Sequence, residues 1–114
     1  MDRDMDAIRK IVLAVKTAEE GVEVSSVGGL NDLIFNYNAN LLIEAALAEG
    51  RKLESGYPPT ISQVDLWKLT WAGHDFADAI KDETIWNKAK EKFIKPGVSF
   101  TFPILLEYLK SLIV

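Results

Sequence analysis

The residues with the clearest capacity for chemistry lie in the stretch KLTWAGHDFADAI, residues 68–80, which contains the only histidine, His74. Asp75 follows it directly, and Asp78 lies four residues later, on the same face of a helix. A histidine beside a carboxylate could perform acid–base catalysis near neutral pH. A zinc site, however, needs three or four ligands, and the chain has no cysteine and no second histidine.

No nucleophile accompanies His74, so few requirements of an active site are met. The pattern instead predicts a helix start, with Thr70 as the N-cap and His74 in the first turn, so both are assigned structural capping roles. Gly73 would allow close backbone packing there. The helix that follows is predicted to bury Ala72, Phe76, Ala79 and Ile80. The sequence therefore predicts a protein that is not an enzyme and has no cofactor.

The elements around this helix follow from periodicity and capping residues. Carboxylates at Asp2, Asp4 and Asp6 suit the first turn of a helix. The predicted elements are a helix 2–17 ended by Gly21, a short strand within 22–24, a helix capped by Asn31 and running to Gly50, a loop or hairpin tip 51–63, a strand 64–69, the helix after Thr70, a helix capped by Thr84 and stopped at Pro96, and a last helix from Phe102 to the end.

Length and composition bound the class of protein. The chain has 114 residues, of which 48% are hydrophobic and 26% charged, the ordinary range for one globular domain. Its N-terminus is charged where a signal peptide would need an apolar core, and no apolar run approaches the roughly 18 residues of a membrane span. Together with the absence of cysteine, this predicts a soluble cytoplasmic protein without a membrane contact or an identifiable small-molecule substrate.

The order of these elements predicts the fold. A helix, a short strand, a second helix, two strands and further helices follow one another as in a winged-helix domain. The predicted class is therefore α+β, mainly helical: a winged-helix-like domain with a small β-hairpin wing. We expect one domain over residues 1–114, with a core of about 2–80 and a C-terminal helical extension of about 81–114.

Three separated motifs carry a family resemblance: MDRDMDAIRKIV, LLIEAALAEG and LTWAGHDFADAIKDETIWNKAKEKF. In this order they resemble a bacterial and prophage-borne family of small proteins known only as a domain of unknown function. The resemblance covers more than half of the chain and implies a winged-helix fold but no activity. Two positions depart from it: Asn38 stands where histidine is expected, and Ala46 where a glycine often ends the second helix. The helix is therefore expected to continue to Gly50.

Two functions fit this fold. A DNA-binding regulator, acting as a dimer, would use the helix 31–49 and the wing 51–63, with Asn36, Asn38, Asn40, Arg51 and Lys52 as candidate macromolecule contacts. Phosphate contacts, however, supply much of the affinity for DNA, and no Lys or Arg occurs from Thr17 to Gly50. The net charge of −4 also disfavours a polyanion. A non-catalytic, prophage-associated module acting through protein–protein contacts is therefore favoured, with the DNA-binding regulator as the alternative.

The last helix predicts self-association. Its apolar residues cover about half of its circumference or more, which is wider than one small core needs. We expect a homodimer, with Ile104, Tyr108, Leu109 and Leu112 as its contacts. The alternative that remains open is a helix sunk deeply within the chain itself.

Overall fold

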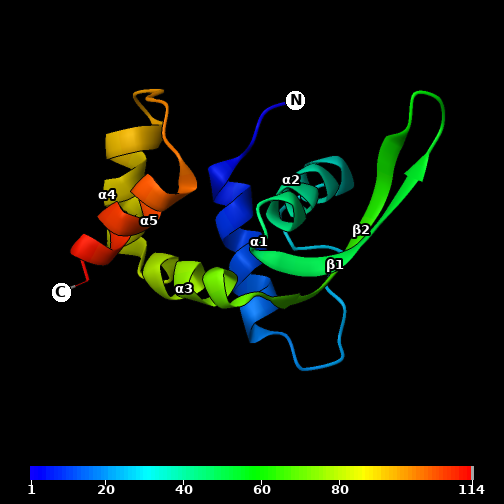
Figure 1. Ribbon diagram of the computed structural model, residues 1–114, viewed down its shortest axis with the longest axis horizontal. Coiled ribbons are helices and arrows are strands. Elements are labelled where there is room, and N and C mark those ends of the chain that lie inside the picture. Colours follow the sequence, from blue (N-terminus) through cyan, green and yellow to red (C-terminus); the bar gives the residue numbers. More distant parts are fainter. Residues whose placement is uncertain (114) are drawn as a thin grey trace. The chain divides into compact units, whose positions relative to one another are not determined.

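The computed structural model describes residues 1–113 and divides the chain into two compact units, Met1–His74 and Asp75–Val114. The first unit holds α1, α2, a two-stranded sheet and the start of α3; the second holds the rest of α3, a π-helical segment, α4 and α5 (Figure 1). The class is α+β, as predicted. None of the helices in the described residues is long and apolar enough to cross a membrane.

Helix α1 spans Met5–Thr17 and begins at one of the predicted acidic caps. The side chain of Asp4 accepts a hydrogen bond from the amide of Ala7 (3.0 Å), which satisfies one of the free amides of the first turn. One face of the helix is buried, through Ala7, Ile8, Ile11, Val12 and Val15. The helix ends at Thr17, and Gly21, with φ of 85°, lies in the turn that follows.

Helix α2 spans Asp32–Glu44, and its N-cap is Asn31, as predicted. Its predicted continuation to Gly50 is wrong. The amide of Leu47 bonds to the carbonyl of Leu42 (2.9 Å) and that of Ala46 to Ile43 (3.0 Å), which is the Schellman pattern of a helix end. Ala46 takes the left-handed conformation, with φ of 59°, that a glycine would normally supply.

Surrounding contacts offset the strain at Ala46. A left-handed conformation costs an alanine roughly 1–2 kcal/mol. In return, Leu47 and Ala48 become buried, which stabilises by roughly 25 cal/mol for each Å² of apolar surface removed from water. The hydroxyl of Thr70 also donates to the carbonyl of Ala46 (2.7 Å). The missing glycine therefore did not remove the helix stop, because tertiary contacts supply it.

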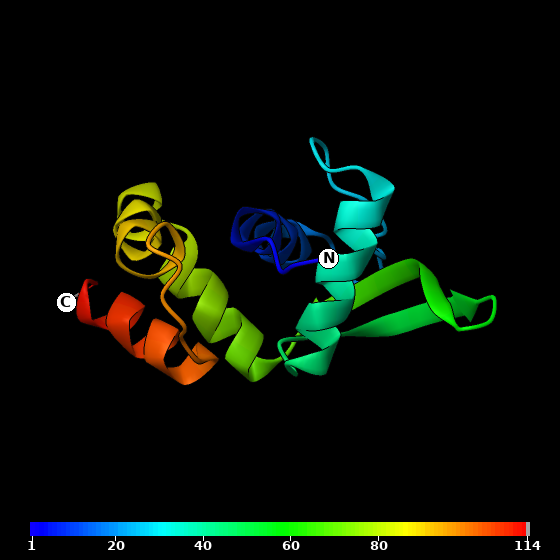
Figure 2. The ribbon, with the colours of Figure 1, turned by 90° about the horizontal axis from the view of Figure 1, so that it is seen from above.

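Strands β1, Ala48–Ser55, and β2, Thr60–Leu69, form an antiparallel hairpin. Most of the predicted loop 51–63 is therefore strand, and only residues 56–59 form the turn. The register shifts between Glu49 and Gly50 and again between Leu53 and Glu54. At the first shift a side chain at Gly50 would overlap the carbonyl of Asp65, so the bulge requires glycine. Figure 2 shows α2 across the base of the hairpin, with the tip extending beyond the helix.

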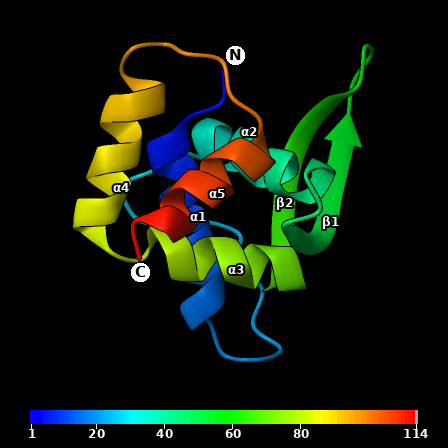
Figure 3. The same cartoon turned by 60° about the vertical axis from the view of Figure 1, so that its left-hand side comes forward.

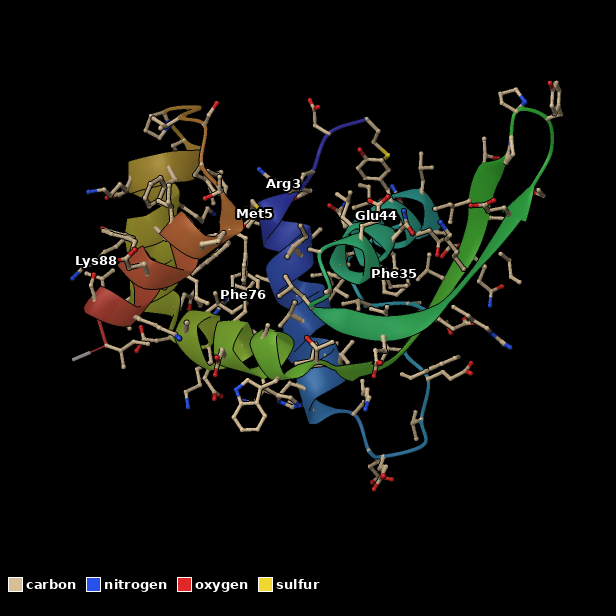
Figure 4. The ribbon with its side chains drawn as sticks, in the orientation of Figure 1. Arg3, Met5, Phe35, Glu44, Phe76 and Lys88 are labelled. Atoms are coloured by element: carbon tan, nitrogen blue, oxygen red, sulfur yellow. The ribbon has the colours of Figure 1, made fainter. Side chains whose placement is uncertain are left out.

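The predicted short strand near Val24 is a single antiparallel bridge. Val24 and Leu66 exchange two backbone hydrogen bonds, of 2.9 and 3.0 Å, on the side of β2 opposite β1. The loop between α1 and α2 is thereby attached to the sheet. The core of this unit contains the fully buried Phe35 (labelled in Figure 4), Leu42, Val64 and Leu66.

Helix α3 spans Trp71–Ile80. The hydroxyl of Thr70 accepts a hydrogen bond from the amide of Gly73 (3.1 Å), the geometry expected of an N-cap. Phe76, Ala79 and Ile80 are buried as predicted, together with Ala77. Ala72 is exposed, contrary to the prediction, because the buried stripe begins one turn later.

The second unit is held together by α4, Glu83–Ala89, the π-helical segment η1, Lys90–Ile94, and α5, Phe102–Ser111. The N-cap of α4 is Asp82, which accepts from the amide of Ile85 (3.0 Å), so the predicted cap at Thr84 is two residues late. Helices α4 and α5 lie side by side (Figure 3). Aromatic pairs fill the space between elements, with ring centroids 5.1 Å apart for Phe76 and Phe102 and 5.2 Å for Phe93 and Tyr108.

Candidate interaction surface

His74 lies in the first turn of α3. Its side chain is exposed, and its backbone amide makes an ordinary helical bond to the carbonyl of Thr70 (2.9 Å). Asp75 lies 3.8 Å from the amine of Lys110 in an ion pair. Among residues 1–113, no group of three or more His, Cys, Asp or Glu side chains is placed to hold a metal ion. The capping hydrogen bond at this helix start comes from Thr70.

Asn36 connects α2 to the sheet. Its Oδ1 accepts from the amide of Val64 (3.0 Å), and its Nδ2 donates to the carbonyl of Ser62 (3.3 Å). The side-chain amide therefore takes the place that a neighbouring strand would occupy at this edge of β2. It is not available as the base-reading group that the sequence suggested.

Asn38 is a second structural asparagine, and its prediction as a macromolecule contact is wrong. The residue is fully buried; its Oδ1 accepts from the amide of Asp4 (2.9 Å), while its Nδ2 donates to the carbonyl of Ile34 (2.9 Å). It therefore joins the start of α1 to α2. A buried amide needs such partners, which is why asparagine is tolerated inside this helix.

Asn40 differs from the other two because its Oδ1 is buried and has no hydrogen-bond partner among the described residues. Asn40 lines a groove of about 520 Å³ between α2 and the start of β2. Leu33 and Tyr37 of α2 and Ile61 of β2 supply most of its apolar wall. This groove was not anticipated from the sequence, because it forms only where one face of α2 meets the start of β2.

The two basic residues of β1 that were predicted as macromolecule contacts, Arg51 and Lys52, lie beside acidic neighbours. Arg51 Nε lies 2.8 Å from Asp65 Oδ2, and its Nη2 lies 3.7 Å from Glu23. Lys52 pairs with Glu54 at 3.3 Å. Each cation predicted as a macromolecule contact thus forms an ion pair within the first unit.

Asp65 is the charged residue that sequence reasoning missed. It is almost fully buried, and it accepts hydrogen bonds from Ser25 (2.6 Å), Gln63 (2.8 Å) and Arg51 (2.8 Å). These bonds hold the pKa of the Asp65 carboxyl at about 2, below its usual 3.8, and the bond from Ser25 lowers the pKa most. The available signal was a lone carboxylate between Val64 and Leu66, both strongly apolar, in a predicted strand.

The predicted dimer contacts on α5 do not form one exposed face. Ile104 is 52% exposed and Leu112 is half-buried. Tyr108 packs against Phe93 and lies under the amine of Lys92, 4.9 Å from the ring centroid. Leu109 is fully buried, so its prediction as a dimer contact is wrong. Its side chain is part of the buried core.

Charge is distributed unevenly between the two units. Asp75–Val114 carries as many lysines as acidic residues, so the whole excess negative charge of the chain belongs to Met1–His74. That unit includes α2, whose first turn carries Asp32 and whose last turn has no basic residue. The field around the hairpin and α2 therefore repels anions.

The fold and this surface define a small α+β domain with an acidic helix, a projecting hairpin and a groove between them. The chain belongs to the family described as Hypothetical protein (DUF2513), whose model matches residues 2–99. It is also 25% identical over 118 residues to an uncharacterized protein from Haemophilus influenzae, covering 99% of this chain and 96% of that relative. No solved structure matches it.

Proposed function

We propose that this protein is a non-catalytic, winged-helix-like module that binds another protein through α2 and the hairpin. The order α1, Val24 bridge, α2, β1 and β2 supports the winged-helix comparison, because Val24 pairs with β2 on the side opposite β1, where the first strand of that fold lies. The cytoplasmic location, the prophage association and the homodimer stay predictions from the sequence.

The observation that carries this proposal is that the polar side chains predicted to contact DNA are largely bonded within the first unit. Asn36 and Asn38 are used inside the first unit, and Arg51 and Lys52 are paired with carboxylates. Reading DNA requires free donors for base edges and cations for phosphates. The exposed side chains of α2 and the hairpin also include large apolar and aromatic ones, Leu33, Leu53 and the fully exposed Tyr57 at the hairpin tip. Such side chains suit a protein partner.

A measurement of duplex binding separates the proposed function from the DNA-binding alternative. We expect no saturable binding of the full chain to a fluorescein-labelled 30-base-pair duplex at micromolar protein, at either 50 or 150 mM salt, measured by fluorescence anisotropy. The acidic field of the first unit is the reason. Submicromolar binding that weakens steeply with salt, and weakens further in Arg51→Ala and Lys52→Ala, would overturn the proposed function.

A further inference from the structure

We propose that the groove between α2 and β2 binds a short apolar peptide segment that carries a lysine or arginine. This inference rests on the proposed function and names the chemistry of the partner. The groove has a volume of about 520 Å³, within the usual range for binding pockets. It lies between a helix and a strand and is partly open to solvent.

The α2 wall of the groove is built by helical spacing. Leu33, Tyr37 and Asn40 lie at positions i, i+4 and i+7, so they form one continuous stripe facing the groove. Leu33 is 68% exposed, so most of its apolar surface faces water. Ile61 provides the apolar contact on the opposite wall. An apolar side chain placed between these walls would remove all of them from water.

The charge of the groove determines which sign of charge on a partner is favoured. Asp32 is the one charged residue among those that line it. The sequence adds no basic residue from Thr17 to Gly50, so Asp32 has no cation on its own helix. A carboxylate at the rim of an apolar groove favours a segment with lysine or arginine and disfavours an acidic one.

Asn40 adds a hydrogen-bonding requirement. Its Oδ1 is buried without a partner, which costs about 1–3 kcal/mol relative to a satisfied acceptor. A ligand N–H, from a peptide backbone or a basic side chain, would satisfy this oxygen if the Asn40 side chain turned it toward the groove that the residue lines. The same atom cannot be satisfied by an apolar or purely anionic group. The groove therefore combines apolar walls, a negative rim and an unused acceptor.

The experiment is selection of a random 12-residue peptide library, displayed on phage, against the full chain. We expect enriched peptides to contain Leu, Ile or Phe next to Lys or Arg and to be depleted in Asp and Glu. A synthetic copy of an enriched peptide should then bind about tenfold more weakly to Leu33→Asp and to Asp32→Lys. The matched controls Val22→Asp and Glu19→Lys make the same chemical changes at exposed positions outside the groove and should bind as the unchanged chain does.

The outcomes separate the groove from the wider surface. Enriched peptides whose binding is lost in Tyr57→Ser but kept in Leu33→Asp and Asp32→Lys would overturn this inference and leave the proposed function standing. Enriched acidic peptides, or peptides weakened equally by the control variants, would also overturn it. Failure to enrich any peptide would count against the groove as a peptide site, whereas the proposed function would be overturned by saturable duplex binding.

Discussion

Replacing Gly73 by alanine is expected to lower the free energy of unfolding by about 3 kcal/mol or more. A side chain at this position would overlap the carbonyl oxygen of Leu47, in the turn that joins α2 to β1. The obstacle is backbone, so no rotamer change can relieve it. The same region also holds the hydrogen bonds of Thr70 to Gly73 and Ala46. Urea unfolding followed by circular dichroism measures the loss.

Gly28→Ala is the matched control for this variant. Gly28 has no atom within 4 Å of the added side chain and does not adopt a positive φ, so alanine there should be neutral or slightly stabilising. An ordinary helical site would gain about 1 kcal/mol from glycine to alanine. If Gly73→Ala were as stable as the unchanged chain, α3 could not begin as closely against the α2–β1 turn as the structure shows.

Replacing Asp65 by alanine is the second large effect, with an expected loss of about 2–3 kcal/mol in the free energy of unfolding. The substitution leaves the hydroxyl of Ser25 and the amide of Gln63 without their acceptor and releases Arg51. It also loosens the attachment of the loop that carries Ser25 to the sheet. Thermal and urea unfolding at pH 7 measure the loss, and a change below about 0.5 kcal/mol would contradict the account.

The pKa of Asp65 gives the same residue a pH signature. Its pKa is about 2 in the folded chain and 3.8 ordinarily, so ionised Asp65 stabilises the folded state above pH 3.8. This contribution is lost progressively as the pH falls from about 4 to 2. Asp65→Asn, which cannot ionise, should show a shallower loss of stability over that range. Parallel curves for the two proteins would show that Asp65 does not titrate as assigned.

The positions of the helices could be predicted from residue spacing along the chain. Their ends could be predicted only where the capping residue is close in sequence. The Asn31 and Thr70 caps use atoms within three residues, so sequence spacing predicted them correctly. The end of α2 could not be predicted in this way. It depends on the hydroxyl of Thr70, 24 residues away, and on burial of Leu47. Without those contacts, an alanine at position 46 is a reason to continue the helix.

The candidate site was harder to predict than the fold, because the roles of its polar residues depend on tertiary neighbours. Three asparagines on one helix indicated a polar contact surface. Instead, the side chain of Asn36 bonds to β2 and that of Asn38 bonds to Asp4, the N-cap residue of α1. Within residues 1–113, the Oδ1 of Asn40 has no hydrogen-bond partner. In the sequence, Asp65 is one polar residue of a strand with alternating apolar positions. Its hydrogen-bond partners Ser25 and Arg51 lie 40 and 14 residues away, so spacing along the strand could not reveal them. Sequence patterns report which side chains are polar and leave open which are already bonded.

The central claim, that α2 and the hairpin contact a protein, is tested most directly by cross-linking from the hairpin tip. Tyr57 is fully exposed, so a photoreactive benzoylphenylalanine at that position should fold normally and reach a bound partner. The same residue at Trp71, which is 87% exposed outside this surface, is the control. In cells, we predict that position 57 gives adducts that are digested by protease and are unaffected by nuclease. Position 71 should give few adducts. Nuclease-sensitive adducts from position 57, or protein adducts from position 71 alone, would contradict the account.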